Sequence, residues 1–262
     1  MNKFILLVLA FLCLNANDIT NGDVEIYATS SPKNLTIDGA QKRWISAKNS
    51  DLKFAIVAAN YHKRGEIVLK NGDESVVYNV VLGDYKKEQI SVNSKKVNPP
   101  KKVQKRINDE REEANKIYNT QNLGLKISQK FILPLNSPIT SHFGSARVFN
   151  KMLKSYHGGT DFRAAVGVEV AASNDGVVVI AKDRYYAGGS VVIDHGEGIY
   201  TQYYHLSKIS VELGQEIKRG EILGLSGASG RVSGPHLHFG VIADGVQVNP
   251  LNFIEKINKF LN

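Results

Sequence analysis

The sequence has very little cysteine. Among its 262 residues Cys13 stands alone, so no disulfide can form within the chain and no cysteine-rich zinc site can exist. A bound metal would therefore need histidine, aspartate or glutamate ligands. After residue 16 the chain also lacks any apolar run long enough to span a bilayer. Its 42% hydrophobic and 22% charged residues exclude a disordered or coiled-coil chain.

Acidic residues are also in deficit. Lysine and arginine number 33 against 25 aspartates and glutamates, giving a net charge of +8 and a pI near 9.3. This balance suits an anionic partner such as a nucleic acid, a membrane surface or an acidic cell-wall polymer. The densest basic stretch, residues 95–106, has no aromatic side chains among its charges, which argues against nucleic-acid recognition.

The first 16 residues are typical of a cleaved signal peptide. Lys3 precedes an almost unbroken apolar run, Phe4 to Leu14, and the small residue Ala16 follows. Lipid attachment at Cys13 is not favoured, because Leu12 precedes it where a small residue is expected. We therefore expect an exported protein with no transmembrane segment after cleavage.

The rest of the chain is predicted to be mainly β, in three parts. Residues 17–95 contain short strand-like runs and predict a small β-sandwich-like domain, regulatory or wall-binding, with Asn71-Gly72 as a type I′ hairpin turn. Its single histidine, His62, is interpreted as a solvated loop residue. Residues 96–128 form a charged connector, in which 101–118 predicts an exposed helix within a solvated linker. Residues 129–256 form a second strand-rich domain, a helix is expected over 251–261, and 257–262 are a tail.

Six of the seven histidines lie in the second domain. His236 and His238 are two residues apart in a strand, so both side chains point to one face. His157 and Asp161 flank a flexible Gly-Gly step. Each pair alone is weak evidence, but together they supply nitrogen and oxygen ligands for a catalytic Zn²⁺ that keeps its fourth position open for water. Spacing alone does not rank the remaining histidines as bases or charge stabilisers, and they are His142, His195 and His205.

Several motifs in this domain resemble the lysostaphin-type, or LytM-like, zinc metallopeptidases. The matching segments cover about half of the chain: Phe143-Gly144, His157-Gly-Gly-Thr-Asp-Phe162, Asp194-His-Gly-Glu-Gly198, Tyr204-His-Leu-Ser207, Gly227-Ala-Ser-Gly230 and Gly234-Pro-His-Leu-His-Phe239. The resemblance implies an antiparallel β-sheet groove, the duplicated hybrid motif. It also implies one Zn²⁺ per chain, and no other cofactor is expected.

The resemblance assigns a role to each matching residue. His157, Asp161 and His238 match the zinc ligands, while His205 and His236 match the two catalytic histidines. His195 matches a position in a turn motif and is interpreted as structural, whereas His142 occupies a variable position. Arg147 and Thr160 are weaker candidates for shaping the groove.

The expected activity is hydrolysis of peptidoglycan stem-peptide crosslinks. The resemblance is to Gram-negative exported endopeptidases of the cell-shape type, which act in the periplasm as D,D-endopeptidases between D-Ala and meso-diaminopimelate, with D,D-carboxypeptidase activity as a further possibility. The alternatives are an exported activator of a peptidoglycan amidase without its own hydrolysis, and a wall-binding module with a vestigial metal. The N-terminal domain is hypothesised to cover the groove until docking, or to serve as a positioning domain or spacer. Partner proteins at the wall or divisome are not identified by the sequence.

Overall fold

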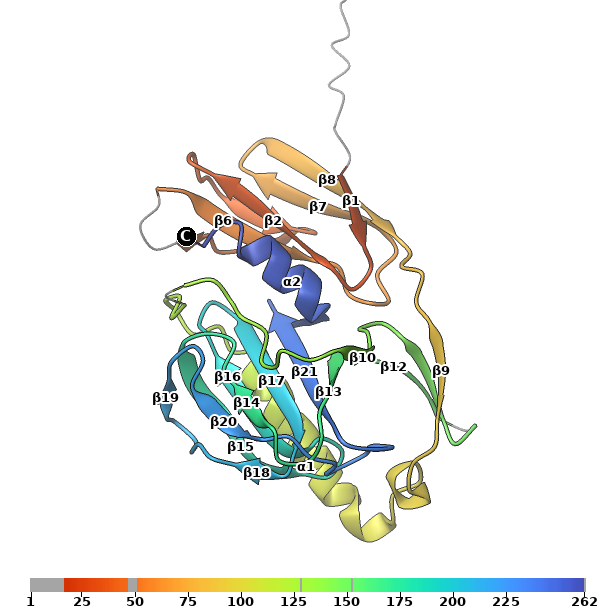
Figure 1. The fold of residues 1–262 in the computed structure, drawn as a ribbon. Helices are drawn as coiled ribbons and strands as arrows, with labels where there is room; N and C mark the ends of the chain where they lie inside the picture. Colours follow the sequence, from red (N-terminus) through yellow and green to blue (C-terminus); the bar gives the residue numbers. More distant parts are fainter. Residues whose placement is uncertain (1–16, 47–50, 128, 152, 262) are drawn as a thin grey trace, which may run out of the picture.

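The computed structural model describes residues 17–46, 51–127, 129–151 and 153–261. The predicted signal peptide and Cys13 lie outside the described residues. The described chain is mainly β, as predicted, with an N-terminal pair of sheets, a long helix, and a C-terminal β domain (Figure 1). No helix in these ranges is long and apolar enough to cross a membrane.

The N-terminal unit is a β-sandwich, as the short strand-like runs indicated. A five-stranded sheet in the order β1-β8-β7-β3-β4 faces a three-stranded sheet in the order β2-β6-β5. The bounds are β1 Asn17–Thr20, β2 Val24–Thr29, β3 Leu35–Ile37, β4 Ala40–Lys42, β5 Ile45–Ser46, β6 Lys53–Ala58, β7 Gly65–Asn71 and β8 Glu74–Val81. Buried side chains from both sheets, including Leu35, Val57, Ile67 and Tyr78, form the core between them. This burial supplies the hydrophobic stabilisation that a small domain needs.

The β7–β8 hairpin turns one residue later than predicted. Asn71 still pairs with Glu74, so the two-residue loop is Gly72-Asp73. Only Gly72 has a positive φ, of 63°, which is the pattern of a type II′ turn rather than type I′. Asn71 is instead buried, and its side chain accepts from the Lys33 amide and donates to the Ser31 carbonyl. The asparagine thus stabilises a neighbouring loop.

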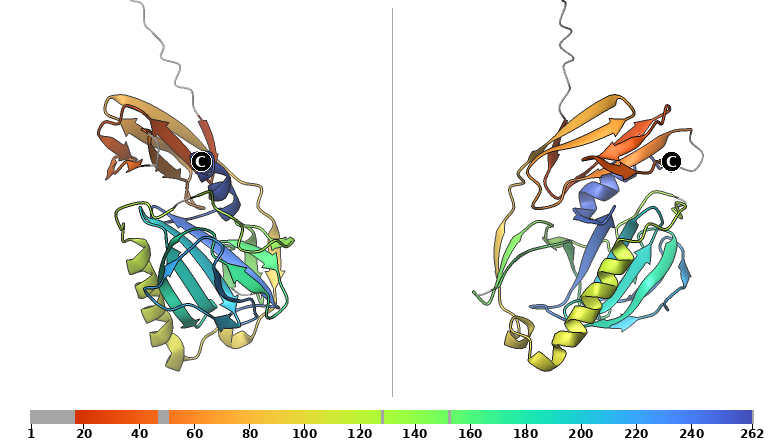
Figure 2. Two further views of the ribbon diagram at one scale, coloured as in Figure 1. Left: turned by 60° about the vertical axis from the view of Figure 1, so that its left-hand side comes forward. Right: turned by 180° about the vertical axis from the view of Figure 1, so that it is seen from behind.

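The connector is packed against the C-terminal domain, which corrects the interpretation as a solvated linker. Just before it, strand β9 (Lys87–Ile90) pairs in parallel with β11 (Ala146–Phe149) of the C-terminal domain, and the 3₁₀ helix η1 (Ser94–Lys96) and α1 (Lys101–Tyr118) follow. Helix α1 coincides with the predicted range and lies against β15 (Figure 2). It buries Ile107 and Ala114 on its narrow apolar stripe.

The C-terminal domain is built on a large, mostly antiparallel sheet. Its strand order is β10-β13-β21-β17-β16-β15-β19, with β22 pairing with β21. Smaller sheets run β14-β20-β18 and β12-β11-β9. The bounds are β10 Ile139–Ser141, β11 Ala146–Phe149, β12 Leu153–Tyr156, β13 Thr160–Arg163, β14 Glu169–Ala171, β15 Gly176–Arg184, β16 Gly188–Asp194, β17 Ile199–Leu206, β18 Lys208–Ile209, β19 Glu216–Ile217, β20 Ile222–Leu225, β21 His236–Ala243 and β22 Val246–Val248.

The C-terminal helix α2 (Pro250–Ile257) lies between the sandwich and the large sheet (Figure 1). Asn249 caps it, because its side chain accepts from the Leu251 amide, and Pro250 starts the first turn. The helix contacts both β2 and β21 and buries Phe253 and Ile257. It ends earlier than the predicted range 251–261. The residues beyond it still pack, since the Phe260 ring stacks on Phe54 at 6.3 Å.

Candidate metal centre and catalytic groove

Two neighbouring strands bring the predicted metal ligands together. In the antiparallel pairing of β13 with β21, Asp161 lies directly opposite His238, and Arg163 lies opposite His236. His157 comes three residues before β13, and the step Gly158-Gly159 turns its ring toward the same place. A side chain at Gly159 would meet the Phe239 carbonyl at 2.4 Å and the His238 ring at 2.6 Å, so only glycine fits there.

His157, Asp161 and His238 form a tight triangle of donor atoms. The His157 Nε2 lies 2.8 Å from Asp161 Oδ1 and 3.0 Å from His238 Nδ1. The distance between His238 Nδ1 and Asp161 Oδ1 is 2.9 Å. Ligands about 2.0–2.1 Å from a tetrahedral zinc lie about 3.3 Å apart, so a small outward movement would admit the ion. Within the described residues, this is the cluster that offers a metal three converging ligands.

The protonation states of the triangle also fit a cation. His157 Nδ1 donates to the His142 carbonyl at 2.9 Å, so Nε2 is the ring nitrogen that faces the other two ligands. Burial lowers the pKa of His238 to about 4. Burial alone would raise the pKa of Asp161, but the contacts with His157 and His238 hold it well below its ordinary value. Two unprotonated rings and one carboxylate are what a zinc ion requires.

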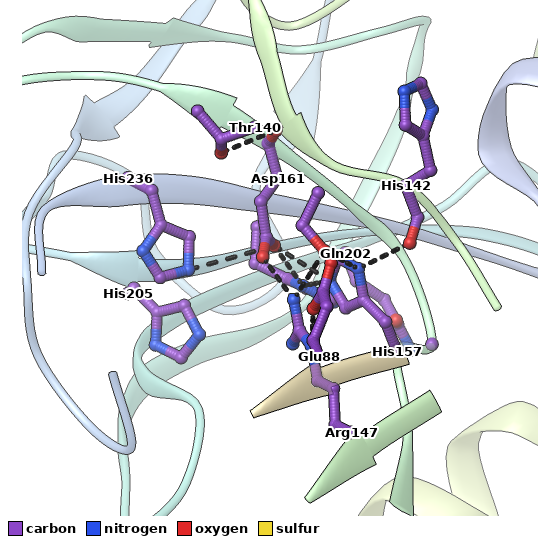
Figure 3. A network of polar contacts seen from close by, with 12 residues as sticks. Glu88, Thr140, His142, Arg147, His157, Asp161, Gln202, His205 and His236 are labelled. Atoms are coloured by element: carbon purple, nitrogen blue, oxygen red, sulfur yellow. Dashed lines mark hydrogen bonds and ion pairs between the residues drawn. The ribbon is translucent and has the colours of Figure 1, made fainter. Parts of the chain in front are cut away.

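A second layer of charged groups holds Asp161 in place (Figure 3). The Arg147 Nη2 donates to Asp161 Oδ2 at 2.7 Å, on the oxygen that the triangle does not use. Arg147 Nε donates to Glu88 on β9 at 3.0 Å, and Ser141 Oγ donates to the same carboxylate at 2.8 Å. Strand β9, which comes before the predicted connector, therefore contributes to the environment of the metal centre. Arg147 was a weak sequence candidate, and Glu88 was missed because no motif surrounds it.

His205 and His236 lie side by side next to the triangle. Their ring centroids are 4.8 Å apart, and His236 Nε2 is 3.7 Å from Asp161 Oδ1. Their Nδ1 atoms donate to the carbonyls of Ser229 and Gly234, so Nε2 is the nitrogen that each ring leaves available. Burial first, and then the neighbouring histidines, lower the pKa of His205 well below its ordinary value. His205 also has a φ of 66°, a strained backbone conformation of the kind that gathers at functional sites.

The other two histidines of the domain lie apart from this chemistry. His195 is fully buried, and its two nitrogens contact the Asp175 carbonyl and the Thr201 hydroxyl, in line with a structural role. The His142 ring points away from the ligands, and its carbonyl is the part that meets His157 (Figure 3). His62 is exposed in the N-terminal unit, as predicted.

The metal centre opens into a hollow of about 200 Å³. Its lining includes His157, His205 and His238 together with Phe149, Tyr186 and Arg231. A second hollow of about 390 Å³ continues from His238 to α1, whose Ile107 and Tyr118 form its wall. The Tyr118 hydroxyl lies 3.1 Å from that of Tyr204, which joins the helix to the groove. Sequence reasoning missed this wall, because the helix lies outside the motif-bearing segment.

The comparisons with known proteins agree with this geometry. Residues 155–250 match peptidase family M23. The chain is 52% identical over 95 residues to peptidoglycan DD-endopeptidase ShyA of Vibrio cholerae, covering 36% of this chain and 22% of the relative. It is 40% identical over 96 residues to DD-carboxypeptidase/endopeptidase Mpg of Neisseria meningitidis, covering 37% and 22%. The chain thus spans about a fifth of the length of these curated relatives.

A solved structure extends the similarity beyond the motif-bearing segment. A crystal structure of a Pseudomonas aeruginosa protein assigned to peptidase M23 aligns with a TM-score of 0.69 and 26% identity, covering 92% of this chain and 96% of that one. The C-terminal β domain with its His-Asp-His triad therefore belongs to peptidase family M23, the lysostaphin-type peptidases. Its triad of His157, Asp161 and His238 offers the converging ligands that a zinc ion needs.

Proposed function

We propose that this chain is a zinc-dependent peptidoglycan hydrolase that cleaves stem-peptide crosslinks. The observation that carries the proposal is the complete set of three converging ligands beside His205 and His236, at an open hollow. The expected bond joins D-Ala to meso-diaminopimelate, with a terminal D-Ala-D-Ala bond as a second substrate. The activities by which the relatives are named, DD-endopeptidase and DD-carboxypeptidase/endopeptidase, support both.

The roles of the residues follow from their geometry. A zinc ion bound by the triad supplies Lewis-acid polarisation and a water of lowered pKa. His236, within 4 Å of the ligand Asp161, is placed to accept a proton from the attacking water. His205, whose Nδ1 is tied to the Ser229 carbonyl, is placed to stabilise charge on the reacting carbonyl oxygen or to return the proton to the leaving amine.

The biological setting is part of the same proposal. Export through residues 1–16 would place the protein in the periplasm, at the cell wall, where crosslink cleavage remodels the wall and cell shape. The net charge of +8 favours contact with an anionic wall. We retain the division into residues 17–95, 96–128, 129–256 and 257–262 as a proposal, in which the sandwich positions the peptidase on its substrate.

Digestion of purified sacculi tests the proposal. Zinc-loaded protein comprising residues 17–262 should convert crosslinked dimers into tetrapeptide monomers, detected by mass analysis of muropeptides. EDTA should abolish this conversion and added zinc should restore it. His238→Ala should lose both zinc and activity, whereas His205→Ala should retain zinc and lose activity. Bound zinc without any change in the muropeptides would contradict the proposal and favour the amidase-activator alternative.

A further inference from the structure

Arg231 is held rigidly at the rim of the hollow. The loop from Gly227 to Arg231 follows β20, and the Arg231 amide donates to the Tyr186 carbonyl at 2.8 Å. Gly230 has a φ of 81°, and a Cβ there would lie 2.4 Å from the same carbonyl. The loop is therefore pressed against the turn before β16, and the backbone of Arg231 has little freedom to move.

The Arg231 guanidinium lies between two aromatic rings. Its central carbon is 4.5 Å from the Phe149 centroid and 4.6 Å from the Tyr186 centroid. Such stacking fixes the plane of the group while leaving its N–H edge available for hydrogen bonds. The side chain is thus oriented in advance, which lowers the entropic cost of binding a ligand.

No carboxylate among the described residues forms an ion pair with Arg231. The other arginine of the hollow, Arg147, has two partners, Glu88 and Asp161. Burial lowers the pKa of Arg231, so its charge is partly desolvated without compensation by an anion. A partly buried cation that opens onto a substrate groove suits an anionic group of the substrate.

We propose that Arg231 binds the free α-carboxylate of the substrate residue that supplies the leaving amine. The inference rests on the proposed function and narrows its substrate class. In a terminal D-Ala-D-Ala bond, the leaving alanine carries that carboxylate. In a D-Ala to meso-diaminopimelate crosslink, the amide nitrogen is attached to a carbon that also bears a free carboxylate. The two bonds therefore present one recognition group at the same position, and one arginine serves both activities.

The position of Arg231 relative to the catalytic groups supports this assignment. Arg231 lines the same hollow as His157, His205 and His238. The loop that carries it also supplies the Ser229 carbonyl, which accepts from His205 Nδ1 at 2.8 Å. Recognition of the carboxylate and orientation of His205 thus depend on one short, rigid segment. A substrate with an internal peptide bond has no carboxylate beside the amide nitrogen, so Arg231 would stay unpaired when that substrate is bound.

The test compares two synthetic stem pentapeptides that end in D-Ala-D-Ala, one with a free C-terminal carboxylate and one with a C-terminal amide. The zinc-loaded protein should have a higher kcat/KM for the acid. Arg231→Gln should lower the acid-to-amide ratio by about 10- to 100-fold, the worth of a charged hydrogen bond, and Arg231→Lys should restore part of it. Arg64→Gln, which removes an exposed arginine bonded only to backbone carbonyls, is the matched control and should keep the ratio.

A merely structural role for Arg231 would give a different result. Equal losses on both peptides, or a loss of zinc in Arg231→Gln, would overturn the inference. If the wild-type protein cleaves neither peptide, the carboxypeptidase activity fails, and crosslink cleavage is decided by the digestion of sacculi. Binding of the two peptides, measured by calorimetric titration, then decides the inference separately. Acid-selective binding that Arg231→Gln removes would support it, and equal binding of acid and amide would refute it.

Discussion

Arg147 donates a hydrogen bond to Asp161 at 2.7 Å. The acceptor is Oδ2, the carboxylate oxygen that the contacts with His157 and His238 do not use. This contact leaves Asp161 a single oxygen, Oδ1, to direct toward His157 and His238. Arg147 is in turn held by Glu88, which belongs to β9 and precedes the peptidase motifs by more than 50 residues. The geometry of the zinc centre therefore depends on a strand that comes from outside the family-matched segment.

Removing the Glu88 charge should weaken zinc binding. In Glu88→Gln, Arg147 loses its ion pair with residue 88 and holds Asp161 less firmly. The Kd for zinc should therefore rise by about 10-fold or more. Competition with a zinc-chelating dye measures this without an activity assay. Glu66→Gln, at an exposed position on β7, removes the same charge and should leave the Kd unchanged. An unchanged Kd in Glu88→Gln would show that Arg147 needs no support from β9.

The two adjacent glycines after His157 should differ sharply when changed to alanine. At Gly159 a Cβ would lie 2.6 Å from His238 Nε2 and 2.4 Å from the Phe239 carbonyl, so Gly159→Ala should displace a ligand and abolish stoichiometric zinc binding. At Gly158 the nearest atom is a Gln247 side-chain carbon at 3.4 Å, an ordinary contact, so Gly158→Ala should retain the metal. Zinc content by atomic absorption distinguishes the two, and equal contents would contradict the geometry.

The buried His195 should make stability depend on pH. Burial lowers its pKa to about 4, against 6.5 for an unperturbed histidine, so the unfolded chain binds this proton first as pH falls. The resulting stabilisation of the folded state is fully present above about pH 6.5. It is lost as the pH falls to about 4, and the total loss is about 3 kcal/mol of unfolding free energy. His195→Gln should be less stable at neutral pH, and its unfolding free energy should change less over that interval. Urea unfolding at several pH values measures this, and parallel pH profiles would refute it.

Phe253 should be essential to the stability of the whole chain. Its ring is fully buried on α2 and packs edge-on to Phe131 at 5.5 Å. Phe253→Ala should lower the free energy of unfolding by about 3–5 kcal/mol. Leu123→Ala, at a position that is 70% exposed, should change it by less than about 0.5 kcal/mol. Thermal unfolding followed by circular dichroism compares them, and similar midpoints would contradict the packing argument.

Local patterns predicted the regular elements well. The range of α1 agrees with the predicted residues 101–118, because Pro99 and Pro100 bound its start and its charged side chains form i,i+4 pairs. Strands β9 and β11 escaped prediction, because each has only four residues and neither alternates regularly between apolar and polar side chains. Pairing with each other, rather than intrinsic preference, makes them strands.

The residues of the candidate site also fall into those that the sequence predicted and those that it did not. His157, Asp161, His205, His236 and His238 were found because short motifs contain them, and the structure brings all five together. Whether each performs its assigned role remains a prediction for the variants described above. Glu88 and Arg231 make their contacts with segments distant in the sequence, and such contacts leave no local pattern. Arg231 had one available signal, its position directly after the Gly227-Ala-Ser-Gly230 segment.

The chain crosses between its two units twice, once through β9 and once through α2. Helix α2 bonds to β2, where Asn252 accepts from the Val24 amide at 2.8 Å and Lys256 pairs with Glu25. The peptidase domain is thus fastened to the sandwich at both of its ends. A fragment that begins near residue 125 would lose β9 and uncover the side of α2 that packs on the sandwich. Inactivity of such a fragment would report a damaged fold, so a regulatory role for the sandwich is better tested by substitutions at its surface than by its removal.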